Sequence, residues 1–161
     1  MAVSEINVVK RDGTKVPLDL EKLHKVIFYA CDKTTGVSAS QVELNSSISF
    51  YDGISTTEIQ ETMIKSAADL ISEENPNYQF VAGRLISYHL RKEAFGEFDV
   101  PPLLDIVKHN VAAKMYEPEL LKWYTEKDFK KLDKMIDHER DQSFTYAAME
   151  QFRGKYLVQD R

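Results

Sequence analysis

The 161-residue sequence contains a single cysteine, Cys31, and has no long apolar run. One thiol excludes a disulfide within the chain and a zinc site made from several cysteines, and it is typical of a reducing compartment. Without a long apolar run, we expect neither a secretory signal nor a membrane span. With a formal net charge of -5, the chain also lacks the basic excess of a general nucleic-acid binder. We therefore expect a cytoplasmic protein that binds no membrane and no nucleic acid.

Glycine is also scarce, and the six glycines form neither GxGxxG nor GxxxxGK[ST]. Because those patterns hold phosphates on backbone amides, any bound nucleotide must be held here by side chains. The histidines are His24, His89, His109 and His138; none has another histidine three or four residues away, which argues against zinc. We interpret Cys31, beside the apolar face of a predicted helix, as a small core residue. The sequence offers no catalytic machinery of its own.

The composition that is present predicts a folded protein with a core. Hydrophobic residues make up 43% of the chain, and the charged residues are spread along it. Near the N-terminus, apolar and polar residues alternate between Ile6 and Leu18. They flank Asp12-Gly13, a pair suited to the positive φ angles of a tight hairpin turn. We predict two short strands, with Pro17 at an edge position.

Four helices are predicted after this hairpin. Asp19 is placed to cap the first, whose apolar face runs to Ala30. The other three are predicted at residues 38–50, 55–70 and 78–95. Capping boxes of Ser38 with Gln41 and of Ser55 with Glu58 mark the starts of two of them.

The chain changes character after the fourth helix. Gly96 and Pro101-Pro102 predict a boundary near residues 96–101, which gives domains at 1–96 and 97–161. Short helices are predicted at residues 103–114, 118–124 and 125–136, the last with Thr125 and Asp128 as a capping box. A further helix at 146–152 is predicted to stop at Gly154, before an extended stretch at 156–158. The predicted fold class is mainly α with a small β element.

Two clusters of charged residues are candidate sites. The first comprises Lys10, Arg11, Lys22, Lys25, Arg91 and Lys92, which would converge on a triphosphate if the hairpin folds over the helices. The alternative is that these are ordinary solvated cations. The second cluster, residues 137–141, resembles a catalytic dyad at first sight, but clustered charges more often form caps and salt bridges. We favour the structural interpretation for residues 137–141.

Several separated motifs resemble a known family. The runs VVKRDG at 8–13, LEKL at 20–23, FYDGIST at 50–56 and LRK at 90–92 resemble the ATP-cone domain. More closely, the whole chain is similar to the N-terminal part of the large (alpha) subunit of class I ribonucleotide reductase. That wider resemblance continues through the runs at residues 124–126, 136–141, 144–148 and 154–158.

The resemblance implies a four-helix bundle capped by a small sheet that includes the N-terminal hairpin, followed by a short all-α segment. It implies ATP or dATP as an allosteric effector beneath this lid, with Mg²⁺; ATP switches the reductase on and dATP usually switches it off. Matching positions give the expected site residues Val8, Lys10, Arg11, Leu18, Asp19, Lys22, Leu23, Thr56, Gln60, Tyr88 and Lys92. The cations would take the phosphates, and Asp19 with nearby backbone groups would read adenine.

Three positions depart from the family pattern. Val16, Asp19 and Gln60 stand where relatives often carry Glu, Asn and His. Gln60 both donates and accepts hydrogen bonds but cannot become cationic, so any charge contribution of a histidine is lost. We expect a change in nucleotide affinity or in dATP inhibition to follow from this residue.

The resemblance also implies an enzyme that this chain cannot complete alone. The reductases need a radical cysteine and a redox cysteine pair on a ten-stranded barrel, and one cysteine cannot supply three. We expect the chain alone to be inactive, as a piece of a longer polypeptide or one part of a split one. The implied partners are the remainder of the alpha chain, the radical-generating beta subunit and further alpha copies.

Two other hypotheses stay open on the sequence. ATP cones also occur beside zinc ribbons in nucleotide-sensing transcription regulators, although an acidic chain with no CxxC pair argues against one. The other hypothesis is a nucleotide-independent helical interaction domain whose cone has decayed. Loss or persistence of ATP binding separates it from a working cone.

Overall fold

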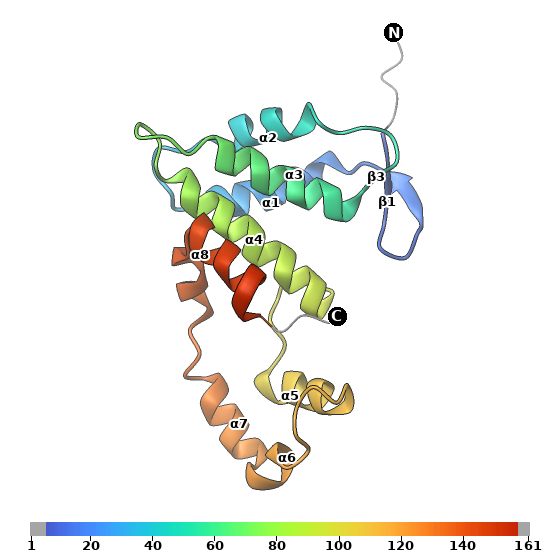
Figure 1. Ribbon diagram of the computed structural model, residues 1–161, viewed down its shortest axis with the longest axis vertical. Helices are drawn as coiled ribbons and strands as arrows, with labels where there is room; N and C mark the ends of the chain where they lie inside the picture. The colour runs from blue at the N-terminus through green and yellow to red at the C-terminus, as the bar shows by residue number, and fades with distance from the viewer. Residues whose placement is uncertain (1–5, 158–161) are drawn as a thin grey trace. The chain divides into compact units, whose positions relative to one another are not determined.

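Residues 6–157 are described by a computed structural model, in which a short β-hairpin leads into a series of helices (Figure 1). They form two units: the first unit comprises residues 6–89 and 142–157, and the second unit comprises residues 90–141. Within residues 6–157, no helix combines the length and apolar character needed to cross a membrane. The mainly helical fold with a small sheet confirms the predicted fold class.

The sheet has three strands in the order β2-β1-β3. Strand β1 (Asn7–Val9) pairs antiparallel with β2 (Lys15–Pro17) and parallel with β3 (Ile54–Ser55). The sequence predicted the hairpin but not β3, where Ser55 was expected only to cap the next helix. Such a short strand forms because β1 supplies a partner, and Gly53 supports the pairing by donating its N–H to Asn7 O at 2.8 Å.

The hairpin turn differs in one detail from the expectation. Gly13 has φ +82°, whereas Asp12 is not among the residues with positive φ. The Gly13 N–H donates to Lys10 O at 2.9 Å, and Asp12 Oδ1 accepts from the Thr14 N–H at 2.9 Å. Gly13, at the end of the turn, is therefore its left-handed residue. This arrangement is typical of hairpin loops longer than the tight two-residue turn that was expected.

The helices of the first unit are α1 (Leu20–Cys31), α2 (Ala39–Ser47), α3 (Thr56–Asp69), α4 (Tyr78–Phe95) and α8 (Tyr146–Gln151). The part of α4 from Leu90 onward belongs to the second unit. Ile27, Met63 and Leu85 are each at most 1% exposed and bring α1, α3 and α4 into one core. Burial of such a side chain stabilises by about 1.5–3 kcal/mol. Val8 and Ile54 extend the core to the sheet, which confirms a helical bundle capped by strands.

The predicted caps are mostly confirmed. Asp19 accepts from the Lys22 N–H at 3.1 Å, and Ser55 with Glu58 forms a complete capping box at α3. The box predicted at α2 is only half formed. Ser38 Oγ accepts from the Gln41 N–H at 3.4 Å, but the Gln41 side chain instead accepts from the buried Tyr78 hydroxyl at 2.7 Å. A tertiary hydrogen bond thus replaces the local one.

The second unit contains α5 (Leu103–Ala112), α6 (Leu120–Trp123), α7 (Glu126–Asp133) and most of a 3-10 helix, η1 (His138–Ser143). Thr125 and Asp128 form the predicted capping box at α7. The three helices predicted between residues 103 and 136 are all present, with shorter ends than expected.

The prediction for the last segment is wrong in part. Gly154 does not end the helix, because α8 continues as a π-helical turn, η2 (Phe152–Tyr156). Tyr156 is therefore helical; Leu157 is extended, and Val158 lies outside the described residues. Aromatic packing explains the continuation, since the Phe152 ring contacts Phe144 at 5.2 Å and Tyr156 at 6.3 Å between centroids.

Candidate functional site

The expected site residues on the hairpin lie at its centre and at its turn. Val8 is 4% exposed and sits in the middle strand, between Val16 of β2 and Ile54 of β3. Lys10 and Arg11 follow at the turn, where both are exposed. Thr14 donates two hydrogen bonds to Asp12, and these lower the pKa of the Asp12 carboxyl and fix the loop that carries the two cations. The hairpin therefore presents cationic side chains from a rigid turn.

A second group of expected residues lies where β2 enters α1. Leu18 is partly buried and donates its N–H to Ile6 O at 2.8 Å. Asp19 caps the helix, and the bond from the Lys22 N–H is the largest cause of the lowered pKa of its carboxyl. The Lys22 ammonium lies 3.6 Å from this carboxylate with a side chain 80% exposed. Such an exposed ion pair is weak, so a stronger anion can displace it.

On α3, Thr56 and Gln60 are one helical turn apart and therefore share a face. The parallel pairing of Val9 with Ser55 brings the start of this helix beside the end of β1. The side-chain oxygen of Gln60 is buried and has no hydrogen-bond partner within the described structure. A buried amide oxygen without a donor is costly, which makes Gln60 an unfilled acceptor at this helix face.

On α4, Tyr88 and Lys92 are likewise one turn apart. Tyr88 is partly buried, and burial raises the pKa of its hydroxyl. Lys92 belongs to the last turn of α4, which counts with the second unit. The strand pairings bring the hairpin beside the start of α3, whereas Lys92 stays a prediction from the resemblance.

The remaining cations of the cluster have other neighbours. Lys25 lines a groove between α1 and α2. Arg91 donates to Asp141 Oδ2 at 2.8 Å, and its guanidinium carbon lies 5.2 Å from the centre of the Phe98 ring, both within the second unit. Arg91 is therefore neither a solvated cation nor directed at the expected site; it is paired with Asp141.

The charged run at residues 137–141 also serves structure. Asp141 accepts from Arg91 and lies 3.8 Å from His138 Nδ1. Asp137 Oδ1 accepts from the Glu139 N–H at 3.1 Å, which caps the 3-10 helix. These contacts confirm the interpretation as a capping and salt-bridge network.

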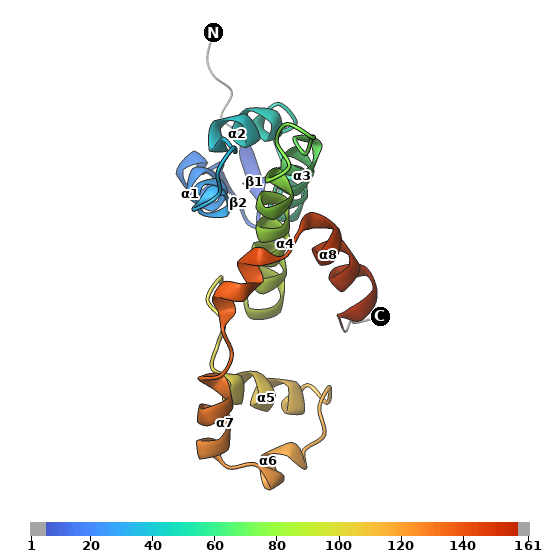
Figure 2. The same ribbon diagram turned by 90° about the vertical axis from the view of Figure 1, so that its left-hand side faces the viewer.

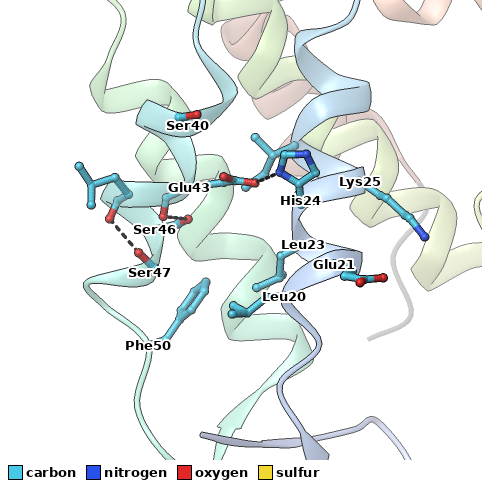
Figure 3. A pocket seen from close by; sticks show the side chains of 12 residues that line it. Leu20, Glu21, Leu23, His24, Lys25, Ser40, Glu43, Ser46, Ser47 and Phe50 are labelled. Carbon is cyan, nitrogen blue, oxygen red and sulfur yellow. Dashed lines mark hydrogen bonds and ion pairs between the residues drawn. The ribbon is translucent and has the colours of Figure 1, made fainter. Parts of the chain in front are cut away.

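The sequence did not predict the groove of about 740 Å³ that lies between α1 and α2 (Figure 3). Leu20, Leu44 and Phe50 contribute apolar walls, and His24 Nδ1 pairs across it with Glu43 Oε1 at 2.5 Å. Of the expected nucleotide residues, this groove contains only Leu23. Leu20 and Leu44 are both more than 60% exposed, and helical spacing alone did not mark these apolar side chains as the walls of a groove.

Comparison with known proteins places this geometry in a family. Residues 6–93 match the model of the ATP cone domain. The chain is 52% identical over 154 residues to the ribonucleoside-diphosphate reductase 1 subunit alpha of Escherichia coli, and equally similar to the subunit alpha of Haemophilus influenzae. It is 39% identical over 158 residues to the subunit alpha of Enterobacteria phage T4.

These matches cover 96–97% of this chain but 20–21% of each relative, so the chain spans about one fifth of their length. They confirm the resemblance given by the sequence motifs. The strands, the bundle and the matched residues agree on one conclusion: the chain belongs to the ATP cone domain family.

Proposed function

We propose that the chain is the nucleotide-sensing module of a ribonucleoside-diphosphate reductase alpha subunit and that it binds ATP or dATP as an allosteric effector. The observation that carries this proposal is the buried, unpartnered oxygen of Gln60 on α3. An adenine nucleotide offers amine and hydroxyl donors that would fill this acceptor. The match to the ATP cone domain supports the same kind of ligand.

The phosphates are assigned to Lys10, Arg11 and Lys22. All three side chains are exposed, and the Lys22 ammonium lies 3.6 Å from the Asp19 carboxylate in an exposed ion pair that a phosphate can displace. Arginine binds phosphate with a planar fork and lysine as a point charge, so the set suits a triphosphate. Lys92 would add a fourth cation from the end of α4.

Apolar and polar groups from the same elements would hold the nucleoside. Val8, Leu18 and Leu23 are buried or partly buried and supply apolar surface beside the hairpin. One carboxylate oxygen of Asp19 accepts from the Lys22 N–H. The carboxylate has further acceptor capacity for the adenine amine. Thr56, Gln60 and Tyr88 complete the set from α3 and α4.

Magnesium would be bound mainly by the nucleotide. Among the residues described, no three His, Cys, Asp or Glu side chains are grouped as metal ligands. Mg²⁺ commonly keeps several waters and binds substrate phosphates with few protein carboxylates, which fits this donor set. Its role here would be to neutralise phosphate charge.

Switching between ATP and dATP requires the protein to sense one hydroxyl. A site that hydrogen-bonds the hydroxyl loses affinity when it is missing, whereas an apolar pocket scarcely responds. Opposite effects on activity therefore require that the two nucleotides favour different conformations. The whole reductase, with the remainder of the alpha chain, a beta subunit and alpha self-association, would read out those conformations.

Calorimetry with the 161-residue chain tests nucleotide binding. We expect saturable heat with ATP and with dATP, and loss of that heat in the K10A/K22A double variant, because several charge-assisted contacts are removed together. K65A is the matched control, since Lys65 is an exposed lysine of α3 outside the site. The absence of heat and of any thermal shift with millimolar ATP or dATP would establish a decayed cone instead.

A further inference from the structure

Residues 142–157, here named the return segment, pack with the first unit although the matched domain ends at residue 93. Arg84 of α4 holds the start of this segment by donating Nε–H to Gln142 O at 3.1 Å. The same guanidinium donates to the carbonyls of Ala30 and Asp32 at 3.0 and 2.7 Å. The partly buried Arg84 side chain thus links the return segment to the end of α1.

The return segment lies beside α4 where α8 begins, as Figure 1 and Figure 2 both show. A Cβ atom added to Gly83 would lie 2.2 Å from Phe144 O and 3.0 Å from Thr145 C. Only glycine allows the two backbones to approach this closely. The contact is therefore specific, and sliding of the segment along α4 is restricted.

The end of the return segment is held by three charged side chains, here named the Arg153 clamp: Glu61, Glu150 and Arg153. The Arg153 guanidinium donates to both oxygens of Glu61 at 2.6 and 3.3 Å. It also donates to both oxygens of Glu150, at 2.8 and 3.2 Å. These hydrogen bonds, led by those to Glu61, raise the pKa of Arg153. Paired bidentate contacts are directional as well as strong.

Glu61 of the Arg153 clamp, and His89 beside it, are each next in sequence to a residue assigned to the nucleotide. Glu61 follows Gln60 on α3, and His89 follows Tyr88 on α4. His89 is 3% exposed, and its Nε2 lies 3.5 Å from Glu61 Oε1. The carboxylate of Glu61 is therefore the point at which α3, α4 and the return segment meet.

We propose that Arg153 couples nucleotide binding in the first unit to the return segment through the carboxylate of Glu61. This inference rests on the proposed function, because it needs a ligand that engages Gln60 and Tyr88. A shift of α3 or α4 on binding moves Glu61 or His89 with it, since neighbouring residues of a helix move together. The bidentate bridge transmits that movement to Glu150 and hence to α8.

Such coupling is reciprocal. If the nucleotide favours one arrangement of the Arg153 clamp, breaking the clamp must change nucleotide affinity by the same factor. Residues outside a ligand site that carry coupling change affinity by about 2- to 30-fold. Arg153 is thus a positioning residue, and its removal should leave binding measurable.

The test combines calorimetry with amide hydrogen exchange on the 161-residue chain, using ATP and dATP as ligands. In the wild-type chain we expect nucleotide to slow exchange in residues 146–157 by about 5-fold or more. R153Q should still bind nucleotide, with a Kd changed by about 2- to 30-fold, but without slower exchange in these residues. K155Q removes an exposed charge of the same segment and should behave as the wild type.

Each outcome decides between the two proposals. If the wild-type chain binds no nucleotide, both the proposed function and this coupling are wrong. If it binds but exchange in residues 146–157 is unchanged, or slows equally in R153Q, only the coupling is overturned. Should R153Q fail to fold, R153K decides, because lysine keeps the charge but cannot bridge both carboxylates bidentately; an undiminished response in R153K overturns the coupling.

Discussion

The first unit and the second unit differ in how much apolar surface they bury. In the first unit, Met63, Leu85 and Ile86 are fully buried at the centre of a core shared by several helices and the sheet. In the described part of the second unit, the buried hydrophobic side chains are Val107 and Phe129. Trp123 and Met135 of that unit are 69% and 73% exposed. Stability of the 161-residue chain should therefore reside mainly in the first unit.

The largest expected effect is a cavity in the core of the first unit. L85A removes a side chain that is 0% exposed, and a buried Leu to Ala change costs about 2–5 kcal/mol. L132A, the matched change in the second unit, alters a side chain that is 44% exposed, so it should cost less than about 1 kcal/mol. Urea denaturation measures both free energies of unfolding. Equal losses would contradict the contrast between the two units.

The next effect concerns the backbone contact between α4 and the return segment. Gly to Ala in an open helix stabilises by about 1 kcal/mol. At Gly83, however, the new methyl group would meet Phe144 O at 2.2 Å, and relieving such overpacking costs about 1–3 kcal/mol. We expect G83A to be destabilised, with faster amide exchange in residues 144–151.

Gly154 provides the control for this change, because an added Cβ there meets nothing within 4 Å. G154A should be neutral or stabilised by up to about 1 kcal/mol. The sign of the change thus distinguishes a glycine required by packing from one that is not. A stabilised G83A would show that the return segment does not rest on α4.

The same contrast separates what the sequence could predict from what it could not. Local signals predicted the hairpin, the Asp19 cap and the boxes at Ser55 and Thr125, because each depends on residues at most a few positions apart. Contacts distant in sequence left no signal. The Tyr78 hydroxyl donates to the Gln41 side chain, which therefore does not complete its predicted capping box. Arg153 donates to Glu61, which is 92 residues away in sequence.

The candidate site stays a prediction that rests on the resemblance. Its residues come from a turn and three helices, so no spacing in the sequence unites Lys10, Lys22 and Gln60. The pairing of Val9 with Ser55 brings the end of β1 beside the start of α3, but β3 was itself unpredicted. The unfilled acceptor of Gln60 is a property of packing, which residue patterns do not report.

A smaller effect is expected from the two complete capping boxes, one in each unit. S55A and T125A each remove the hydroxyl that accepts from the N–H three residues later, and loss of such a cap costs about 1 kcal/mol. Amide exchange should show that S55A loosens the start of α3 and that T125A loosens only α7. S38A is the control with a half-formed box and should cost less than S55A. If T125A also loosens α3, the two units unfold together.

The smallest expected effect is the pH dependence of these caps. Bonds from the Ser55 hydroxyl and N–H lower the pKa of Glu58 below 4.5, and bonds from Thr125 lower that of Asp128 below 3.8. A carboxyl with a lowered folded pKa stabilises the fold above its unfolded pKa, and this contribution disappears as pH falls through the folded value. Both contributions are therefore complete at pH 7 and decline below about pH 4.5.

E58Q tests the first of these contributions, because glutamine keeps the reciprocal cap but does not titrate. The loss of urea stability between pH 7 and pH 3 should be smaller in E58Q than in the wild type. D128N removes the corresponding titration in the second unit, so its effect should be confined to amide exchange in α7. An unchanged pH dependence in E58Q would mean that other carboxylates dominate the acid response of the first unit. In that case the cap at Glu58 would not set the acid stability of the first unit. The difference in stability between the two units would then come from the buried core.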